Sequence, residues 1–131
     1  MTRMLIDTNI YSNALRGRPA VVNTLRRAPH IGIASISLGE LLSGFGRGTH
    51  EQANRRQLAE FLDSPRVAVY SVTESTAEFY ATVLQGLRES GNPIPTNDIW
   101  IAAVALENGL GLCSLDAHFE AVSGLVRVPL G

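Results

Sequence analysis

Four acidic residues stand beside apolar segments at widely spaced positions, and their placement suggests shared chemistry. They are Asp7, Glu40, Asp98 and Asp116. Asp7 and Asp116 each follow a short apolar run that is typical of a buried strand. If these two strands are parallel, both carboxylates emerge at the same edge of the sheet, however far apart they lie in the chain. No structural role is evident for an acid at the position of Asp7, which favours a functional role.

Carboxylates gathered at one edge need a positive partner. Two of them held near 4 Å repel by about 4 kcal/mol at an effective dielectric near 20. The sequence has one cysteine, and its three histidines, His30, His50 and His118, look dispersed, which argues against zinc. Hard oxygen ligands favour Mg²⁺ or Mn²⁺. The residues therefore predict a magnesium or manganese site.

Glu40 and Asp98 also have structural interpretations. The "SLGE" segment places Glu40 three residues after Ser37, which is the spacing of a capping box in the first turn of a helix. Asp98 can stabilise a helix N-terminus by its charge alone. To join the other acids, Asp98 needs a helix that starts at the carboxyl edge and runs antiparallel to the following strand, as crossover helices do.

The elements that must position these acids alternate along the chain. Hydrophobic spacing and helix-ending residues predict strands and helices in turn. Strands are expected at 4–8, 30–37, 66–72, 110–116 and near the C-terminus, and helices at 9–17, 18–29, 37–45, 49–65, 73–91 and 99–109. Thr73 or Ser75 is expected to cap the long fifth helix, and the sixth helix is expected to be buried on most sides. This alternation predicts an α/β/α sandwich with a central, mainly parallel sheet of four or five strands.

Composition narrows the class of protein further. The 131 residues are 45% hydrophobic and 18% charged, which is typical of a globular chain and leads us to expect a single domain spanning 1–131. The opening apolar run is too short for a signal peptide or a membrane span, so we expect a cytoplasmic protein. The lone Cys113 is interpreted as an inert core residue.

Four motifs in one order resemble the PIN-domain nucleases, and in particular the VapC-type toxins. The motifs are "LIDTN" with Asp7, "SLGELLSG" with Glu40, "NDIWIAAVALENG" with Asp98 and "CSLDAHF" with Asp116. The resemblance covers nearly the whole chain. It implies a ribonuclease that uses these acids to bind Mg²⁺ or Mn²⁺, with a cognate antitoxin as its partner and commonly a homodimeric state.

The resemblance also implies supporting roles. Thr8 and Asn9 match the polar end of the first motif, and Ser114 stands where many relatives have threonine. At His118 some relatives carry another polar or acidic side chain, so a further carboxylate ligand is missing there. As a hypothesis, Asp7, Asp98 and Asp116 hold the metal that activates a water for attack on phosphorus, while Glu40 positions that water or a second ion.

Basic side chains offer contacts for RNA phosphates. All eleven basic residues other than histidine are arginines, and without the four acids the rest of the chain is net basic. Candidates for phosphate binding are Arg16, Arg18, Arg47, Arg55 and Arg56. An equally open interpretation is that these arginines lie on ordinary solvated helix faces.

Two other functions remain as alternatives. A non-catalytic PIN-like domain would only bind RNA or a protein. A phosphatase of the haloacid-dehalogenase type also starts with an acid after a buried strand, but Asn9 stands where its second acid belongs and the chain has no lysine. The missing lysine also argues against a P-loop nucleotide triphosphatase.

Overall fold

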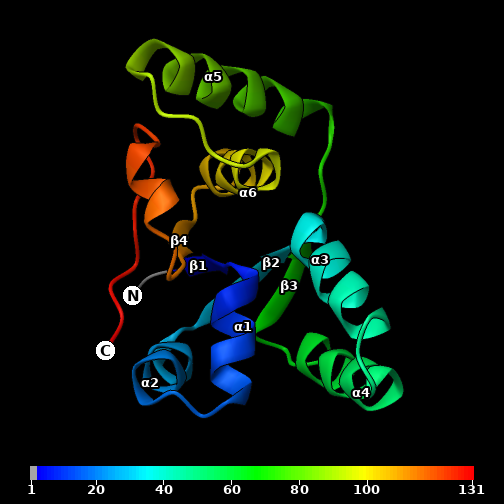
Figure 1. Cartoon of the computed structure of the whole chain (residues 1–131). Coiled ribbons are helices and arrows are strands. Elements are labelled where there is room, and N and C mark those ends of the chain that lie inside the picture. The colour runs from blue at the N-terminus through cyan, green and yellow to red at the C-terminus, as the bar shows by residue number, and fades with distance from the viewer. Residues whose placement is uncertain (1–2) are drawn as a thin grey trace.

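A parallel sheet of four strands forms the centre of the molecule (Figure 1). The computed structural model describes residues 3–131. Its strands are β1 (Arg3–Ile6), β2 (His30–Ala34), β3 (Val67–Tyr70) and β4 (Gly111–Cys113). Their order across the sheet is β3-β2-β1-β4, and every neighbouring pair is parallel. Crossover helices make these parallel connections, as the alternating pattern predicted.

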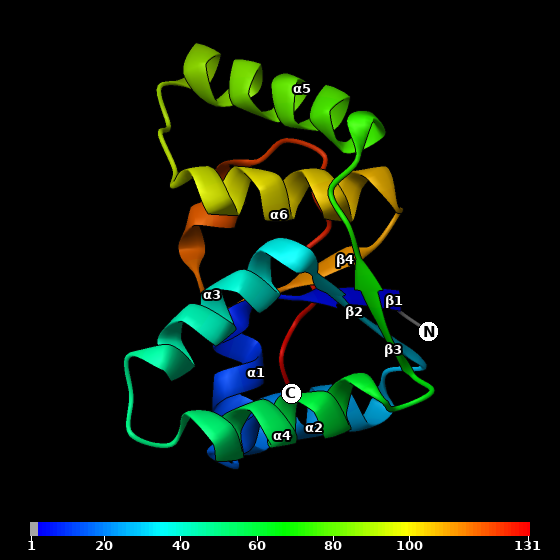
Figure 2. The ribbon, with the colours of Figure 1, turned by 90° about the vertical axis from the view of Figure 1, so that its right-hand side faces the viewer.

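Helices lie on both sides of the sheet (Figures 1 and 2). They are α1 (Thr8–Leu15), α2 (Pro19–Arg27), α3 (Ser35–Gly46), α4 (Glu51–Leu62), α5 (Glu74–Ser90), α6 (Thr96–Glu107) and the 3₁₀ turn η1 (Ala117–Ala121). In both views α1, α2 and α4 lie on one side, and α6 lies on the other with α5 outside it. The predicted α/β/α sandwich is confirmed. Within residues 3–131 no helix combines the length and apolar character that crossing a bilayer requires.

The core is divided between the two faces of the sheet. Strand side chains alternate in direction, so Met4 and Ile6 join one apolar cluster while Leu5 joins the other. The first cluster includes Ile10, Tyr11 and other residues of the α1 side. Cys113 is fully buried in it, and burial raises the pKa of its thiol to about 11, which fits the inert role expected of it.

The opposite cluster is built on α6. Ile99 and residues 101–105 of this helix are buried, as its near absence of charge predicted. The outer helix α5 is anchored to it by Tyr80, whose ring stacks on Trp100 with centroids 4.1 Å apart. The predicted cap of α5 is also confirmed. Thr73 accepts a hydrogen bond from the Thr76 amide, and Gly91 ends the helix with φ of +71°.

The structure corrects the predicted second strand and the predicted C-terminal strand. The strand expected at 30–37 ends at Ala34, and α3 begins directly at Ser35. Ser37 is therefore inside the helix and fully buried, and it caps nothing. The last apolar segment forms no regular strand: it makes a single parallel bridge between Arg127 and Leu112. Two backbone hydrogen bonds with β4 hold this segment beside the sheet. Because the segment is not a regular strand, the sheet has four strands.

Candidate active site

Asp7 lies where β1 passes into α1, and its carboxylate is buried and hydrogen-bonded to neighbouring groups. Its side chain caps α1 by accepting the Thr8 amide at 2.8 Å, and Thr8 Oγ1 lies 3.2 Å from the same oxygen. The other oxygen accepts Ser114 Oγ at 2.9 Å and Asn9 Nδ2 at 3.4 Å. Asp7 is only 5% exposed. Both of its oxygens are therefore oriented by neighbouring polar groups.

Ser114 joins the first and last motifs. Its hydroxyl donates to Asp7 and accepts the Asp116 amide at 3.0 Å, while Asn9 Oδ1 accepts the Leu115 amide at 3.2 Å. These bonds fix the loop after β4 against the start of α1. All three residues predicted to support the site, Thr8, Asn9 and Ser114, thus contact Asp7.

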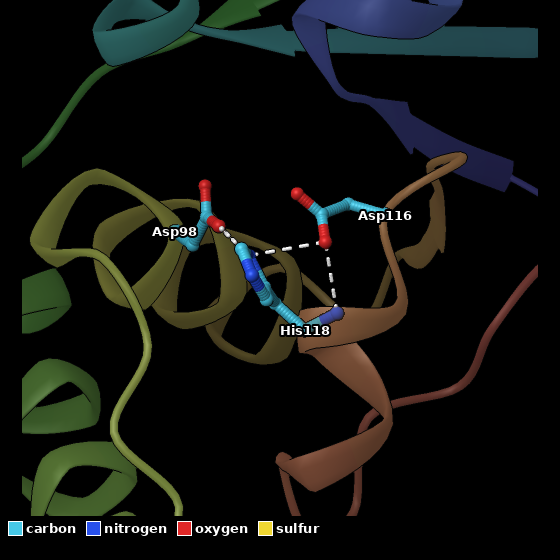
Figure 3. Close-up of side chains that lie close together, drawn as sticks. All are labelled: Asp98, Asp116 and His118. Atoms are coloured by element: carbon cyan, nitrogen blue, oxygen red, sulfur yellow. Dashed lines mark hydrogen bonds and ion pairs between the residues drawn. The ribbon is translucent and has the colours of Figure 1, made fainter.

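Asp98 and Asp116 meet across the gap between α6 and η1, with His118 between them (Figure 3). Asp98 is in the first turn of α6, as expected. Asp116 lies three residues beyond the end of β4, not directly after the strand as predicted, and it caps η1 by accepting the His118 amide at 2.9 Å. The His118 Nδ1 atom is 3.1 Å from Asp98 Oδ2 and 3.0 Å from Asp116 Oδ1.

The electrostatics of Asp98 show how crowded the acids are. Burial is the largest cause that raises the pKa of Asp98, and the negative charges of Asp7 and Asp116 raise it further. The hydrogen bond with His118 and its charge oppose this shift. Asp98 therefore senses the other two aspartates as near neighbours, and a cation among them would relieve the repulsion.

Glu40 reaches the same edge from α3. It lies in the second turn of that helix, because α3 begins at Ser35, so the prediction of a capping box with Ser37 was wrong. One of its carboxylate oxygens is 3.2 Å from Thr8 Oγ1, and the other accepts Asn97 Nδ2 at 3.4 Å. These two contacts link Glu40 to the segments that carry Asp7 and Asp98.

Three residues at this edge were not found from the sequence. His118 was interpreted as dispersed, yet it contacts two of the acids. Its position two residues after Asp116 was the available signal. Asn97 adjoins Asp98 and touches Glu40. Arg127 donates to the carbonyl oxygens of Ser114 and Asp116, each at 3.2 Å, and no local sequence pattern indicates this contact.

The donors at this edge fit a divalent cation of the magnesium or manganese type. One ligand atom each from Asp98, Asp116 and His118 lie within 4.8 Å of one another. Carboxylate oxygens dominate the set, as hard cations require, and no thiolate adjoins it, because Cys113 is buried within the core. These three residues can hold a divalent cation.

The predicted phosphate-binding arginines are all exposed but lie on other segments. They are Arg16, Arg18, Arg47, Arg55 and Arg56. Arg16 follows the end of α1 opposite to Asp7, and Arg47 follows α3. Arg55 pairs with Glu51 one turn earlier in α4 at 3.4 Å. They border the α1, α3 and α4 side of the molecule.

Residues 4–125 match the PIN domain family. The chain is 33% identical over 107 residues to ribonuclease VapC1 of Haemophilus influenzae strain R2866, covering 78% of each chain. It is 29% identical over 91 residues to ribonuclease VapC4 of Mycobacterium tuberculosis, covering 70% of each. Its fold matches a chain in the crystal structure of VapBC2 from Rickettsia felis bound to a promoter DNA fragment, with a TM-score of 0.86, 24% identity and coverage of 99% of this chain and 100% of that one.

The fold and the acidic edge thus define a PIN-type domain, and the chain belongs to the PIN-domain family. Within that family it groups with the VapC ribonucleases. The resemblance drawn from the four motifs is confirmed.

Proposed function

We propose that this protein is a metal-dependent endoribonuclease that hydrolyses RNA phosphodiester bonds and acts as the toxin of a toxin–antitoxin pair. One observation carries the proposal: four acids from four separate segments converge on one edge of the sheet. They are Asp7, Glu40, Asp98 and Asp116, connected through Thr8, Asn97 and His118. Such a concentration of negative charge is costly unless it binds a cation. Residues 1–131 are proposed to act as one nuclease domain.

Asp7, Asp98 and Asp116 would hold the cation, which we propose to be Mg²⁺ or Mn²⁺, and Glu40 stands beside them. When bound there, a divalent cation supplies positive charge for a phosphate oxygen and makes water a better nucleophile at neutral pH. This explains how an acidic edge binds an anionic substrate.

The protein's own residues orient this chemistry. Ser114, Thr8 and Asn9 fix both oxygens of Asp7, so its geometry is set before any ligand arrives. Glu40 is half-buried, and its contacts with Thr8 and Asn97 hold it on the α3 side of the edge. From there it positions the attacking water or a second ion.

Arginines on the α1, α3 and α4 side are proposed to bind the RNA backbone. Arg16, Arg18, Arg47, Arg55 and Arg56 are exposed, although Arg55 is already paired with Glu51 and Arg47 donates to Ser43 Oγ. If several contact phosphates, RNA affinity falls steeply as salt rises. A flat salt dependence would instead assign these arginines to ordinary solvated surface.

The partners follow from the relatives. Solved structures with this fold include VapBC complexes from Rickettsia felis and Salmonella typhimurium. We propose that this chain likewise binds a cognate antitoxin, forms a homodimer and acts on RNA in the cytoplasm. Among the apolar side chains of α1 and α3, Tyr11 and Leu41 are buried in the core, whereas Leu15 is 47% exposed and is available for such contacts.

The decisive experiment compares Asp7→Asn with the unchanged protein on end-labelled RNA, with Mg²⁺, with Mn²⁺ and with EDTA. We expect the unchanged protein to cleave only with a divalent cation, and Asp7→Asn to fold but not cleave. Asp63→Asn is the matched control, because Asp63 is an exposed acid at the end of α4. Cleavage retained by Asp7→Asn would refute the site. RNA binding without cleavage by the unchanged protein would favour the non-catalytic alternative.

A further inference from the structure

His118 touches two proposed metal ligands, yet the function proposed above gives it no role. Its Nδ1 atom lies 3.1 Å from one oxygen of Asp98 and 3.0 Å from one oxygen of Asp116. Figure 3 shows the ring reaching from η1 to a place between the two carboxylates. The side chain is 48% exposed, so packing does not force the ring there.

The backbone around His118 holds it on this side of the site. Asp116 caps η1 by accepting the His118 amide at 2.9 Å. The next residue, Phe119, is 1% exposed and anchors the turn in the core. Arg127 binds the carbonyl oxygens of Ser114 and Asp116 and so restrains the preceding loop. These contacts fix the backbone position of His118. Only rotation about its side-chain bonds remains free.

The position of Nδ1 suits a ligand atom. A bare nitrogen lone pair facing two carboxylates is repelled, so Nδ1 must either donate a hydrogen or share a cation with them. The three donor atoms lie within 4.8 Å of one another, close enough for a single ion to contact all of them. A set of Asp98, Asp116 and His118 mixes oxygen with nitrogen, unlike a site made of carboxylates alone.

We propose that His118 is a nitrogen ligand of the divalent cation and that it makes this site prefer Mn²⁺ to Mg²⁺. The proposal rests on the metal site of the proposed function and specifies its chemistry. Mg²⁺ keeps oxygen ligands and water. Manganese also binds in carboxylate sites that include histidine, a donor set that does not suit Mg²⁺, which binds through carboxylates and retained water. The nitrogen therefore adds affinity for one ion and little for the other.

The rival role for His118 is positioning. As a hydrogen-bond donor it would only orient Asp98 and Asp116, and its loss would weaken binding of both ions equally. His118→Asn separates the two roles, because an asparagine amide can still donate to the carboxylates but offers no imidazole nitrogen. His118→Ala removes both functions. His50→Asn is the matched control, since His50 is exposed before α4 and its side chain makes no capping bond.

The first measurement is calorimetric titration of RNA-free protein with MnCl₂ and with MgCl₂. For His118→Asn and His118→Ala we expect Mn²⁺ affinity to fall by roughly tenfold or more, in the range found for residues around metal sites. Mg²⁺ affinity should change by less than about threefold. The His50→Asn protein should bind both ions as the unchanged protein does. Circular dichroism melting of each variant verifies that it is folded.

The second measurement is the electron spin echo signal of bound Mn²⁺. We expect modulation from a coordinated nitrogen in the unchanged protein and in His50→Asn, and its loss in both His118 variants. Equal loss of affinity for both ions, or a Mn²⁺ complex without nitrogen modulation, overturns the proposal and leaves the metal site intact. If the unchanged protein binds neither ion, the proposed metal-dependent function itself fails.

Discussion

The carboxyl edge of the sheet and its α6 face are built on opposite principles. On the α6 face, apolar side chains are buried against one another, and Thr76 at the start of α5 donates to Glu107 at 2.6 Å. At the carboxyl edge, acids crowd together, and the charges of Asp7 and Asp116 help to raise the pKa of Asp98. The side chains of the α6 face find their partners within the protein. The carboxylates at the carboxyl edge repel one another and need a cation from outside.

This difference indicates where stability and activity reside. Apolar burial and helix capping on the α6 face lower the free energy of the folded state. Like charges at the carboxyl edge raise it until a cation binds. Substitutions at the edge should therefore abolish activity with little loss of stability, and substitutions on the α6 face should do the reverse.

The largest effect is expected for Asp98→Asn. Removing one charge from the crowded edge should raise the melting temperature of the metal-free protein, because the raised pKa shows that the charged form of Asp98 is disfavoured in the folded state. Cleavage with metal should fall by at least ~100-fold, since loss of even an outer residue of a metal site costs about 10–100-fold. Melting curves and an RNA cleavage assay test both parts.

Metal addition sharpens the same test. At 100 times its dissociation constant, a cation that binds only the folded state stabilises the unchanged protein by about 2.7 kcal/mol. We expect Asp98→Asn to lose most of this gain and Asp63→Asn to keep it. A metal-free Asp98→Asn protein that melts below the unchanged protein would contradict the view that the edge is repulsive.

A smaller effect, on stability alone, is expected for Gly32→Ala. The Tyr70 ring lies directly over Gly32, and its hydroxyl is 2.6 Å from His30 Nε2. An added Cβ would be 2.6 Å from Tyr70 Cε1 and 3.2 Å from Leu5 Cδ1. Overpacking of this kind costs about 1–3 kcal/mol. Urea denaturation measures the loss, and RNA cleavage at a temperature where the variant is folded should be unchanged.

A double-mutant cycle shows whether the ring causes that loss. In a Tyr70→Ala background the space over Gly32 is open, so Gly32→Ala should cost far less than in the unchanged protein. Equal costs in both backgrounds would assign the destabilisation to the backbone and not to the ring.

The smallest effect is expected for Thr73→Ala at the start of α5. Thr73 caps this helix by accepting the Thr76 amide, and losing such a cap costs about 1 kcal/mol. Thr82→Ala is the control, because the exposed Thr82 hydroxyl only bonds the Glu78 carbonyl within the same helix. Denaturation should distinguish the two variants. If they are equally stable, the cap contributes nothing measurable.

Much of the fold was predictable because its signals are local. The start of α2 at Pro19, the cap at Thr73 and the left-handed Gly91 each depend on the conformational preferences of one residue. The prediction failed at Ser37, where an S-x-x-E pattern indicated a helix start. There the helix begins as soon as β2 ends, so packing against the sheet decided the boundary and local capping did not.

By itself, the sequence indicated four acids as candidates for one site, because their place near the ends of apolar segments and the starts of helices is a matter of local pattern. Thr8, Asn9 and Ser114 were expected as supporting residues because of the resemblance to the PIN-domain nucleases. Only the tertiary structure decided that His118 lies between Asp98 and Asp116, that Asn97 touches Glu40 and that Arg127 holds the loop before η1. These contacts join segments that are distant in the chain, and their geometry depends on how helices and loops pack around the sheet.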